Sequence, residues 1–253
     1  DDLPPGSDIG NLSLFGYNPH ETFTGRAPLE AAKQGILLNE DEVAFRCNLV
    51  TLEDGAMRSF TSGHISTKEA AQIISSLNEA YADLPVKLHT GVSYRHLSII
   101  KSRDLSIDEL TGVECEPPHN ITDRAYAPYV PRGRAGAFLR TLMERSQTVL
   151  ADHPVSRARR ERGALAPTSV WLWGQGRSPK MRTFRDRFGI EGAVVSAVDL
   201  VNGIGVCAGL EVLHVSGATG YLDTNYDGKV SAALAALERV DFAYVHLEAP
   251  DET

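Results

Sequence analysis

The stretch GAVVSAVDLVNGIGVCAG, residues 192–209, decides the fold class. It begins with an apolar run typical of a buried strand and passes into a glycine-rich turn that starts a helix. Apolar strands and helices alternate on both sides of it, from residue 168 to residue 253. This alternation is typical of a parallel sheet with helices on both faces. We therefore predict an α/β unit over residues 168–253.

The elements expected in this unit can be placed along the chain. The predicted strands cover residues 168–174, 192–200, 211–215 and 241–249, and the predicted helices cover 178–189 and 228–240. A parallel sheet needs more strands than these, and the last one reaches almost to the final residue. We therefore expect the chain to be a piece of a longer protein whose remainder completes the sheet.

The middle of the chain follows a different pattern. Strands are predicted at 42–52 and 57–65, a capped amphipathic helix at 66–84, a further strand at 86–101 and a helix at 133–153. This order indicates an α+β arrangement. We divide the chain into three segments: residues 1–38 with turns and one short helix, an α+β domain at 39–167, and the α/β unit at 168–253, with the first and last segments as two parts of one interrupted core.

Composition restricts the function. The 253 residues are 42% hydrophobic and 23% charged, which is ordinary for a soluble globular protein. The net charge of −8 argues against a nucleic-acid partner. The three cysteines are far apart, so neither a zinc site nor a disulfide framework is indicated. Without a predicted membrane span or signal peptide, we expect a cytoplasmic protein.

Ser7 stands in PPGSDIGNLSLFGYNP, residues 4–19, between a proline turn and a predicted helix. Its hydroxyl would lie beside the free N–H groups and the positive end of the helix dipole, an environment that suits a phosphate. A plain N-cap role explains the same position. No GxSxG motif supports an acyl hydrolase, so a metal ion would be the natural activator of this hydroxyl.

Acidic residues and a histidine follow the last predicted strand. His246, Glu248, Asp251 and Glu252 stand where ligands bind in α/β sheets. Carboxylates suit hard metal ions, although an ordinary acidic loop explains the pattern equally well.

The glycines of residues 201–209 follow the spacing GxGxxxG, close to a dinucleotide fingerprint. No acidic residue at a strand end completes that fingerprint, since Asp227 lies in a turn. Close packing of a helix on its strand is the preferred interpretation of these glycines.

Basic side chains in the middle block suggest an anionic ligand. Arg46 lies in a predicted strand, and His64, Arg95 and His96 lie in or beside turns. Arginine binds phosphate or carboxylate through two parallel bonds, and histidine can bond a phosphoryl oxygen. Each residue alone has a structural explanation, but together with Ser7 they indicate a small phosphorylated substrate that carries a carboxylate.

Several motifs in chain order resemble the archaeal-type 2,3-bisphosphoglycerate-independent phosphoglycerate mutases. They are PPGSDIGNLSLFGYNP, TGRAPLEAA, AFRCNLVT, SGHIST, GVSYRH, WLWGQG, SAVDLVNGIG, SGATGYLDTNY and HLEAPDE. The resemblance implies an alkaline-phosphatase-like parallel-sheet core, incomplete here, with an inserted α+β phosphotransferase domain. It further implies interconversion of 3-phosphoglycerate and 2-phosphoglycerate through a phosphoserine, without added 2,3-bisphosphoglycerate.

The resemblance also implies roles for individual residues. Ser7 falls on the nucleophile, and Ser7 and Asp251 fall on ligands of two divalent metal ions, typically Mn²⁺, with Mg²⁺, Zn²⁺ or Co²⁺ as alternatives. His64 and Arg95 fall on substrate-binding positions, with Arg46 and Arg159 as further candidates. The other metal ligands of the family would lie outside these residues, so we expect this piece to be inactive by itself.

Two positions depart from the pattern of the family. Asn202 stands where a basic residue is expected, and Ser156 stands where an asparagine is expected. Two other functions stay open: a metal-dependent phosphotransferase such as a homoserine kinase, and a non-catalytic module that binds a phosphorylated metabolite.

Overall fold

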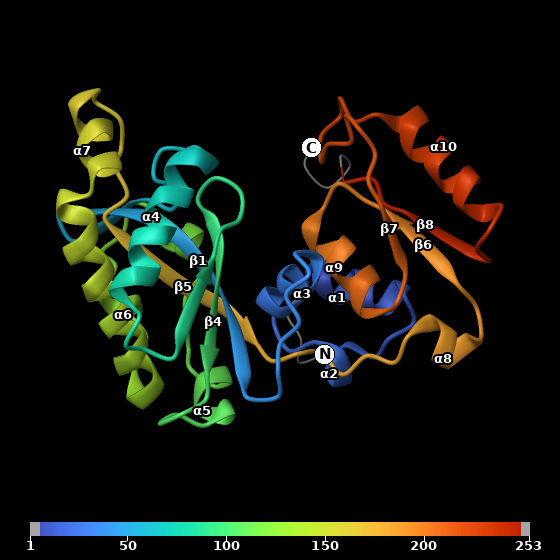
Figure 1. Ribbon diagram of the computed structural model, residues 1–253, viewed down its shortest axis with the longest axis horizontal. Helices are drawn as coiled ribbons and strands as arrows, with labels where there is room; N and C mark the ends of the chain where they lie inside the picture. The colour runs from blue at the N-terminus through green and yellow to red at the C-terminus, as the bar shows by residue number, and fades with distance from the viewer. Residues whose placement is uncertain (1–5, 249–253) are drawn as a thin grey trace. The chain divides into compact units, whose positions relative to one another are not determined.

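The computed structural model describes residues 6–248, which form two compact units (Figure 1). One unit contains residues 38–177, and the other combines the segments on either side of it, up to residue 37 and from residue 178 onward. Across the described residues, no helix combines the length and the apolar character needed to cross a membrane.

The unit of residues 38–177 is built on a sheet of antiparallel pairs. Its strands are β1 (Glu42–Glu53), β2 (Ala56–Ser59), β3 (Val86–His89), β4 (Arg95–Lys101) and β5 (Ser169–Gly176). They lie in the order β2-β1-β4-β3, and β5 pairs with β1. The alternation of side chains along β1 places Val43, Phe45, Cys47 and Leu49 in the core.

Helices cover the core face of this sheet. The unit contains α4 (Thr67–Ala80), α5 (Ile107–Thr111), α6 (Gly133–Asp152) and α7 (Pro154–Glu161), with the short 3₁₀ turns η1 (Pro118–Ile121) and η2 (Ala127–Tyr129). Figure 1 shows α4 and α6 side by side against the strands. Their apolar faces contribute Ile73, Leu77, Leu139 and Leu142 to the same core.

The other unit contains a parallel sheet of β6 (Gly192–Val195), β7 (Glu211–Leu213) and β8 (Phe242–Val245), in the order β7-β6-β8 among the described residues. Its helices are α1 (Ser7–Leu14), α2 (Pro19–Thr22), α3 (Arg26–Lys33), α8 (Phe184–Phe188), α9 (Asp199–Cys207) and α10 (Tyr226–Leu237). The crossover from β6 to β7 and the crossover from β7 to β8 run in opposite directions, so α9 and α10 lie on opposite faces of the sheet (Figure 1). The predicted α/β class and the parallel strands are confirmed for this unit.

The predicted boundary at residue 167 is wrong. The strand predicted at 168–174 was placed with the parallel sheet, but β5 pairs antiparallel with β1 through Cys47↔Leu172 and Leu49↔Val170. The structural division falls after residue 177. Periodicity could not settle this point, because a fully apolar run is equally compatible with either sheet.

Other elements differ from prediction in extent. The strand expected at 86–101 is two strands, β3 and β4, paired antiparallel. The strand expected at 241–249 is only partly buried over β8, because β8 lies at the edge of its sheet in the described residues. The region before residue 38 contains α1, α2 and α3 instead of one short helix.

The glycines of α9 explain the helix packing predicted from the sequence. A Cβ atom on Gly203 would lie 2.0 Å from the Leu29 carbonyl oxygen, and one on Gly205 would lie 2.5 Å from Val194 Cγ1. Both glycines stand inside the helix and not in a preceding turn. They allow α9 to approach α3 on one side and β6 on the other.

Candidate functional site

Ser7 is the first residue of α1 and is exposed to solvent. The N-cap is Gly6, which has no side chain, so the alternative that Ser7 is itself the N-cap does not hold. The reason is that the helical conformation already begins at Ser7, while Gly6 is extended. Within the first turn, Asp8 Oδ1 accepts from the Ile9 N–H at 2.9 Å. The positive end of the helix dipole favours a nearby anion, and the Asp8 carboxylate already accepts from one N–H group of this turn.

The start of α1 is tied to β8 by a short chain of hydrogen bonds. The side-chain nitrogen Nδ2 of Asn11 donates to the Ser7 carbonyl oxygen at 2.7 Å, and the Tyr244 hydroxyl donates to Asn11 Oδ1 at 2.9 Å. The Phe15 and Tyr244 rings pack with centroids 4.4 Å apart. Ser7 therefore stands on a helix whose position is fixed from the sheet.

Polar side chains gather where β6 and β8 end. Ser196 Oγ lies 3.3 Å from His246 Nδ1, and His246 Nε2 lies 3.3 Å from Glu248 Oε2. Lys229 of α10 is 1% exposed and donates from Nζ to the His246 carbonyl oxygen at 3.2 Å. Burial lowers the pKa of Lys229, and the charge of Glu248 opposes this shift. These contacts fix the direction in which the chain leaves β8.

The predicted metal ligands are only partly covered by the structure. Asp251 and Glu252 lie outside the described residues. Within residues 6–248, no group of three or more His, Cys, Asp or Glu side chains could hold a metal ion. The exposed Ser7 hydroxyl supplies the oxygen donor that a hard divalent ion prefers, so its chemistry fits the predicted role.

The two positions that depart from the family pattern are both buried. Asn202 donates from Nδ2 to the Ser196 carbonyl oxygen at 3.1 Å, and its Oδ1 has no hydrogen-bond partner in the described part of the chain. Ser156 is fully buried, and its hydroxyl donates to the Pro167 carbonyl oxygen at 3.2 Å. Ser156 therefore serves the packing of its own unit.

In the unit of residues 38–177, Arg46 and Arg95 share one face of the sheet. Asn48 of β1 pairs with Arg95 of β4 and lies two residues from Arg46, so the three side chains point to the same side. The Arg46 guanidinium lies 4.1 Å from the centroid of the Trp173 ring. Trp173 Nε1 donates to Asn48 Oδ1 at 3.1 Å. The sheet therefore brings both predicted arginines together.

Residues missed by the sequence analysis surround these arginines. Trp173 packs against the Arg46 guanidinium, Asn48 accepts a hydrogen bond from Trp173, and the His119 ring packs against Trp173 with centroids 5.4 Å apart. The alternation in WLWG was available as a signal, because it places both tryptophans on one face of a strand. The partner of that strand was not predictable, so the tryptophans could not be related to Arg46.

His64 is exposed and lies in the turn that follows β2. Arg159 lies beneath the same turn, with only 5% of its side chain exposed. Each of its three guanidinium nitrogens donates within the protein: Nε to Leu165 O, Nη1 to Glu69 Oε2, and Nη2 to Ser62 O and Gly63 O. Direct substrate binding by Arg159 therefore does not fit the structure. The arginine cluster at 157–162 otherwise forms the expected solvated helix face.

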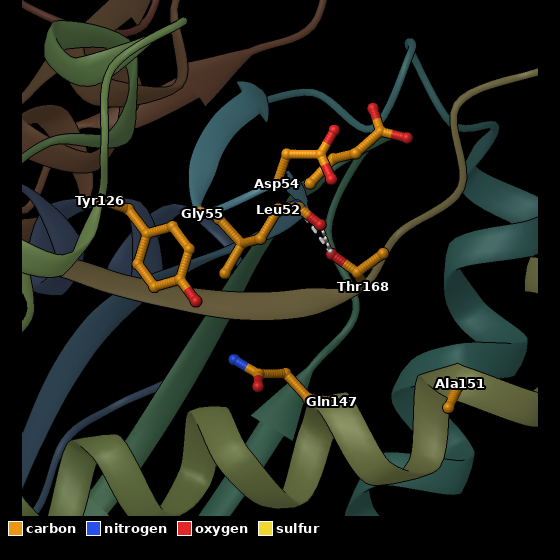
Figure 2. Close-up of a pocket in the computed structure, with 8 residues that line it drawn as sticks. Leu52, Asp54, Gly55, Tyr126, Gln147, Ala151 and Thr168 are labelled. Atoms are coloured by element: carbon orange, nitrogen blue, oxygen red, sulfur yellow. Dashed lines mark hydrogen bonds between the residues drawn. The ribbon is translucent and has the colours of Figure 1, made fainter.

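A pocket of about 370 Å³ lies at the end of the β1–β2 hairpin, and Figure 2 shows the residues that line it. The Tyr126 ring and the Gln147 side chain reach into it, and Leu52 exchanges hydrogen bonds with the Thr168 hydroxyl. None of the predicted site residues lines it. Glu53 and Asp54 at its rim would repel a phosphorylated ligand, so the pocket is not suited to the substrate predicted from the sequence.

The fold and these residues define a class: an α/β protein whose parallel-sheet unit presents a helix N-terminal serine and is interrupted by an α+β unit with clustered arginines. The model of the 2,3-bisphosphoglycerate-independent phosphoglycerate mutase family matches residues 1–156. The chain belongs to this family.

Individual relatives agree with this assignment. The chain is 50% identical over 250 residues to a 2,3-bisphosphoglycerate-independent phosphoglycerate mutase of Methanosarcina acetivorans, and the match covers 99% of this chain but 62% of the relative. The match to a solved structure of the PH0037 protein from Pyrococcus horikoshii covers 98% of this chain and 58% of that protein's chain, with a TM-score of 0.75 and 26% identity. A cofactor-independent phosphoglycerate mutase from Thermoplasma acidophilum, at 23% identity and a TM-score of 0.63, shows likeness of fold alone. The chain thus spans less than two thirds of the relatives' length.

Proposed function

We propose that the protein interconverts 3-phosphoglycerate and 2-phosphoglycerate, with Ser7 as the residue that transiently carries the phosphoryl group. The observation that carries this proposal is the exposed Ser7 hydroxyl at a helix N-terminus whose N-cap residue, Gly6, has no side chain. The N–H groups there suit the phosphoryl oxygens, and return of the group to the 2-hydroxyl removes any need for added 2,3-bisphosphoglycerate. Membership of the mutase family supports the substrate class.

In this proposal the unit that contains Ser7 is an alkaline-phosphatase-like core for two divalent metal ions, most naturally Mn²⁺. Ser7 and Asp251 would be ligands, together with Asp and His residues outside these 253 residues. The ions would lower the pKa of the serine hydroxyl and stabilise charge on the phosphoryl group. The contacts of His246 with Ser196, Lys229 and Glu248 would then fix the chain just ahead of Asp251.

The unit of residues 38–177 would bind the substrate. Arg95 is exposed, so its guanidinium would bind a carboxylate or phosphate directly. Arg46 is 9% exposed and held against Trp173 on the same face of the sheet, so it would contribute mainly its positive charge. His64 would hydrogen-bond a phosphoryl oxygen. Exclusion of water is essential, because water on the phosphoserine would convert a mutase into a phosphatase.

The test compares Ser7→Ala with Ser13→Ala in the full-length protein supplied with Mn²⁺. Ser13 is also an exposed serine of α1, but its hydroxyl donates to the Ile9 carbonyl oxygen. We expect Ser7→Ala to abolish isomerisation of the two phosphoglycerates and Ser13→Ala to retain it. Retained activity in Ser7→Ala would refute the nucleophile assignment.

The same preparation separates the other functions. ATP-dependent phosphorylation of homoserine without isomerase activity would identify a kinase. Binding of phosphoglycerate that persists in the presence of a chelator, again without turnover, would identify a non-catalytic binding module. Mass spectrometry of the acid-quenched enzyme should find a phosphate on Ser7.

A further inference from the structure

The turn that presents His64 has an unusual backbone. Ser62, Gly63 and His64 have φ angles of 48°, 61° and 51°, so three consecutive residues occupy the left-handed region. Two of them carry side chains, for which this region is unfavourable. Such a conformation persists only where the surrounding structure determines it, and it is frequent at functional sites.

Side chains around the turn supply part of this support. Ser62 Oγ donates to the Leu49 carbonyl oxygen at 2.9 Å, which fixes the turn to β1. The backbone N–H of Gly63 donates to Ser59 Oγ at 3.1 Å, and that of His64 donates to Thr61 Oγ1 at 3.2 Å. These bonds hold the N–H side of the turn and leave its carbonyl groups to another partner.

Arg159 is that partner. Its Nη2 donates to the carbonyl oxygens of Ser62 at 2.8 Å and Gly63 at 3.2 Å, the two residues directly before His64. Its Nε donates to Leu165 O at 2.8 Å. Only 5% of the side chain is exposed, so the guanidinium lacks the exposure needed to reach a substrate.

Glu69 holds the other edge of the same guanidinium. Its Oε2 accepts from Arg159 Nη1 at 2.9 Å and also from the Ser66 N–H at 3.2 Å, as part of the capping box of α4. The fork of Arg159 is therefore fixed by the N-terminus of a helix whose cap lies two residues after His64. A lysine could not make this set of contacts, since it lacks the planar fork.

We propose that Arg159 is a positioning residue that acts through His64: it holds the left-handed turn of residues 62–64 so that the imidazole faces the phosphoryl group of the substrate. This inference rests on the proposed function, in which His64 contacts the substrate. It replaces the direct anion-binding role that the sequence suggested for Arg159.

A double-mutant cycle in the full-length enzyme tests the functional part. We expect Arg159→Gln to lower kcat/KM for phosphoglycerate by between about tenfold and a hundredfold, as misplacement of a binding group does. In a His64→Ala background the same substitution should have no further effect. Multiplied losses in the double variant would overturn the proposal, because they would mean that Arg159 acts on the substrate independently. An unchanged rate in His64→Ala would refute the proposed role of His64 and the functional part of this inference with it.

A second measurement tests, without reference to activity, whether Arg159 holds the turn of residues 62–64. With ¹⁵N-labelled histidine, Arg159→Gln should speed amide hydrogen exchange at His64 by about tenfold or more, since the turn opens more often. Arg145→Gln is the control, because this substitution also removes an ion pair, with Asp83, and a hydrogen bond to a carbonyl oxygen, that of Ala80. It should leave the exchange rate of the His64 amide unchanged. An unchanged His64 amide in Arg159→Gln would overturn the proposal. If Arg159→Gln does not fold, Arg159→Lys should show the same changes at smaller amplitude, and wild-type behaviour of that variant would overturn it equally.

Discussion

Tyr244 of β8 donates a hydrogen bond of 2.9 Å to Asn11 of α1, and the Asn11 amide holds the Ser7 carbonyl oxygen at 2.7 Å. A strand near the end of the chain therefore fixes the first turn of the helix near its beginning. These two hydrogen bonds connect Tyr244 to the backbone of the proposed nucleophile. Removal of the tyrosine hydroxyl should therefore lower activity by more than the loss of stability alone would cause.

Tyr244→Phe should therefore lower the rate of phosphoglycerate isomerisation several-fold, with a loss of about 1 kcal/mol in the free energy of unfolding. Tyr17→Phe is the matched control, since the Tyr17 hydroxyl of the same unit donates to the Arg182 carbonyl oxygen at 2.6 Å. It should cost similar stability and leave the rate unchanged. Steady-state kinetics and urea unfolding of both variants measure the difference. Equal rates in the two variants would show that the bond serves stability alone.

Gly203→Ala should destabilise the unit that contains α9 by about 3 kcal/mol or more, because the added Cβ would overlap the Leu29 backbone. Gly10 of α1 offers the opposite case, since a Cβ atom added there would meet nothing within 4 Å. Gly10→Ala should gain up to about 1 kcal/mol from helix propensity. Thermal unfolding of both variants checks the pair. A well-tolerated Gly203→Ala would mean that α9 and α3 can separate at little cost.

Acid should weaken the unit of residues 38–177 through Glu69. Burial acts to raise the pKa of this carboxyl, but hydrogen bonds from Arg162 and Ser66 and the charge of Arg159 lower it from 4.5 to about 2. A depressed folded-state pKa gives stability that is complete above pH 4.5 and is lost as the pH falls toward 2.

Glu69→Gln should remove this part of the pH dependence. Both tryptophans of the chain lie in β5, so their fluorescence during urea unfolding reports on this unit. Glu109→Gln is the control, because Glu109 also completes a capping box, with Ser106, but its side chain is 35% exposed compared with 21% for Glu69. Its effect should be smaller because solvent screens the charge. Identical acid profiles for wild type and Glu69→Gln would contradict the prediction.

His96 should produce a second, separate loss of folding stability in acid. It is 2% exposed, and burial lowers its pKa from 6.5 to about 4. The unfolded chain binds the proton more readily, so stability should fall as the pH drops from 6.5 to 4, above most of the Glu69 window. In His96→Gln the slope of unfolding free energy against pH should flatten over this interval. A wild-type slope in the variant would assign the loss to other groups.

Much of the fold was predictable because local patterns determine it. The alternation along β1, the Ser66 and Glu69 capping box of α4 and the apolar run of β6 each specify their element from neighbouring residues. The pairing of β5 was not predictable, since the run is apolar throughout and only distant residues decide its partner. For the same reason the extent of the inserted unit was misplaced by about ten residues.

The candidate site residues stay predictions, and the structure describes only their exposure and contacts. Ser7, His64 and Arg95 are exposed, as a role with substrate requires. The same reasoning misjudged Arg159, because an arginine among other arginines on a helix gives no sign of which one is buried. Its burial depends on Glu69 and the left-handed turn, which are brought together only by the tertiary fold.

The pairing of Ala44 with Gly176 places the two ends of the inserted unit side by side. The unit of residues 38–177, about 140 residues, is therefore an insertion between the two segments of the other unit, and its two ends lie close together. A unit whose ends lie close together can be exchanged as a whole without a change in the connections of the parallel sheet. In the proposed function, replacement of this one unit would change the groups that bind the substrate and leave the unit that contains Ser7 intact.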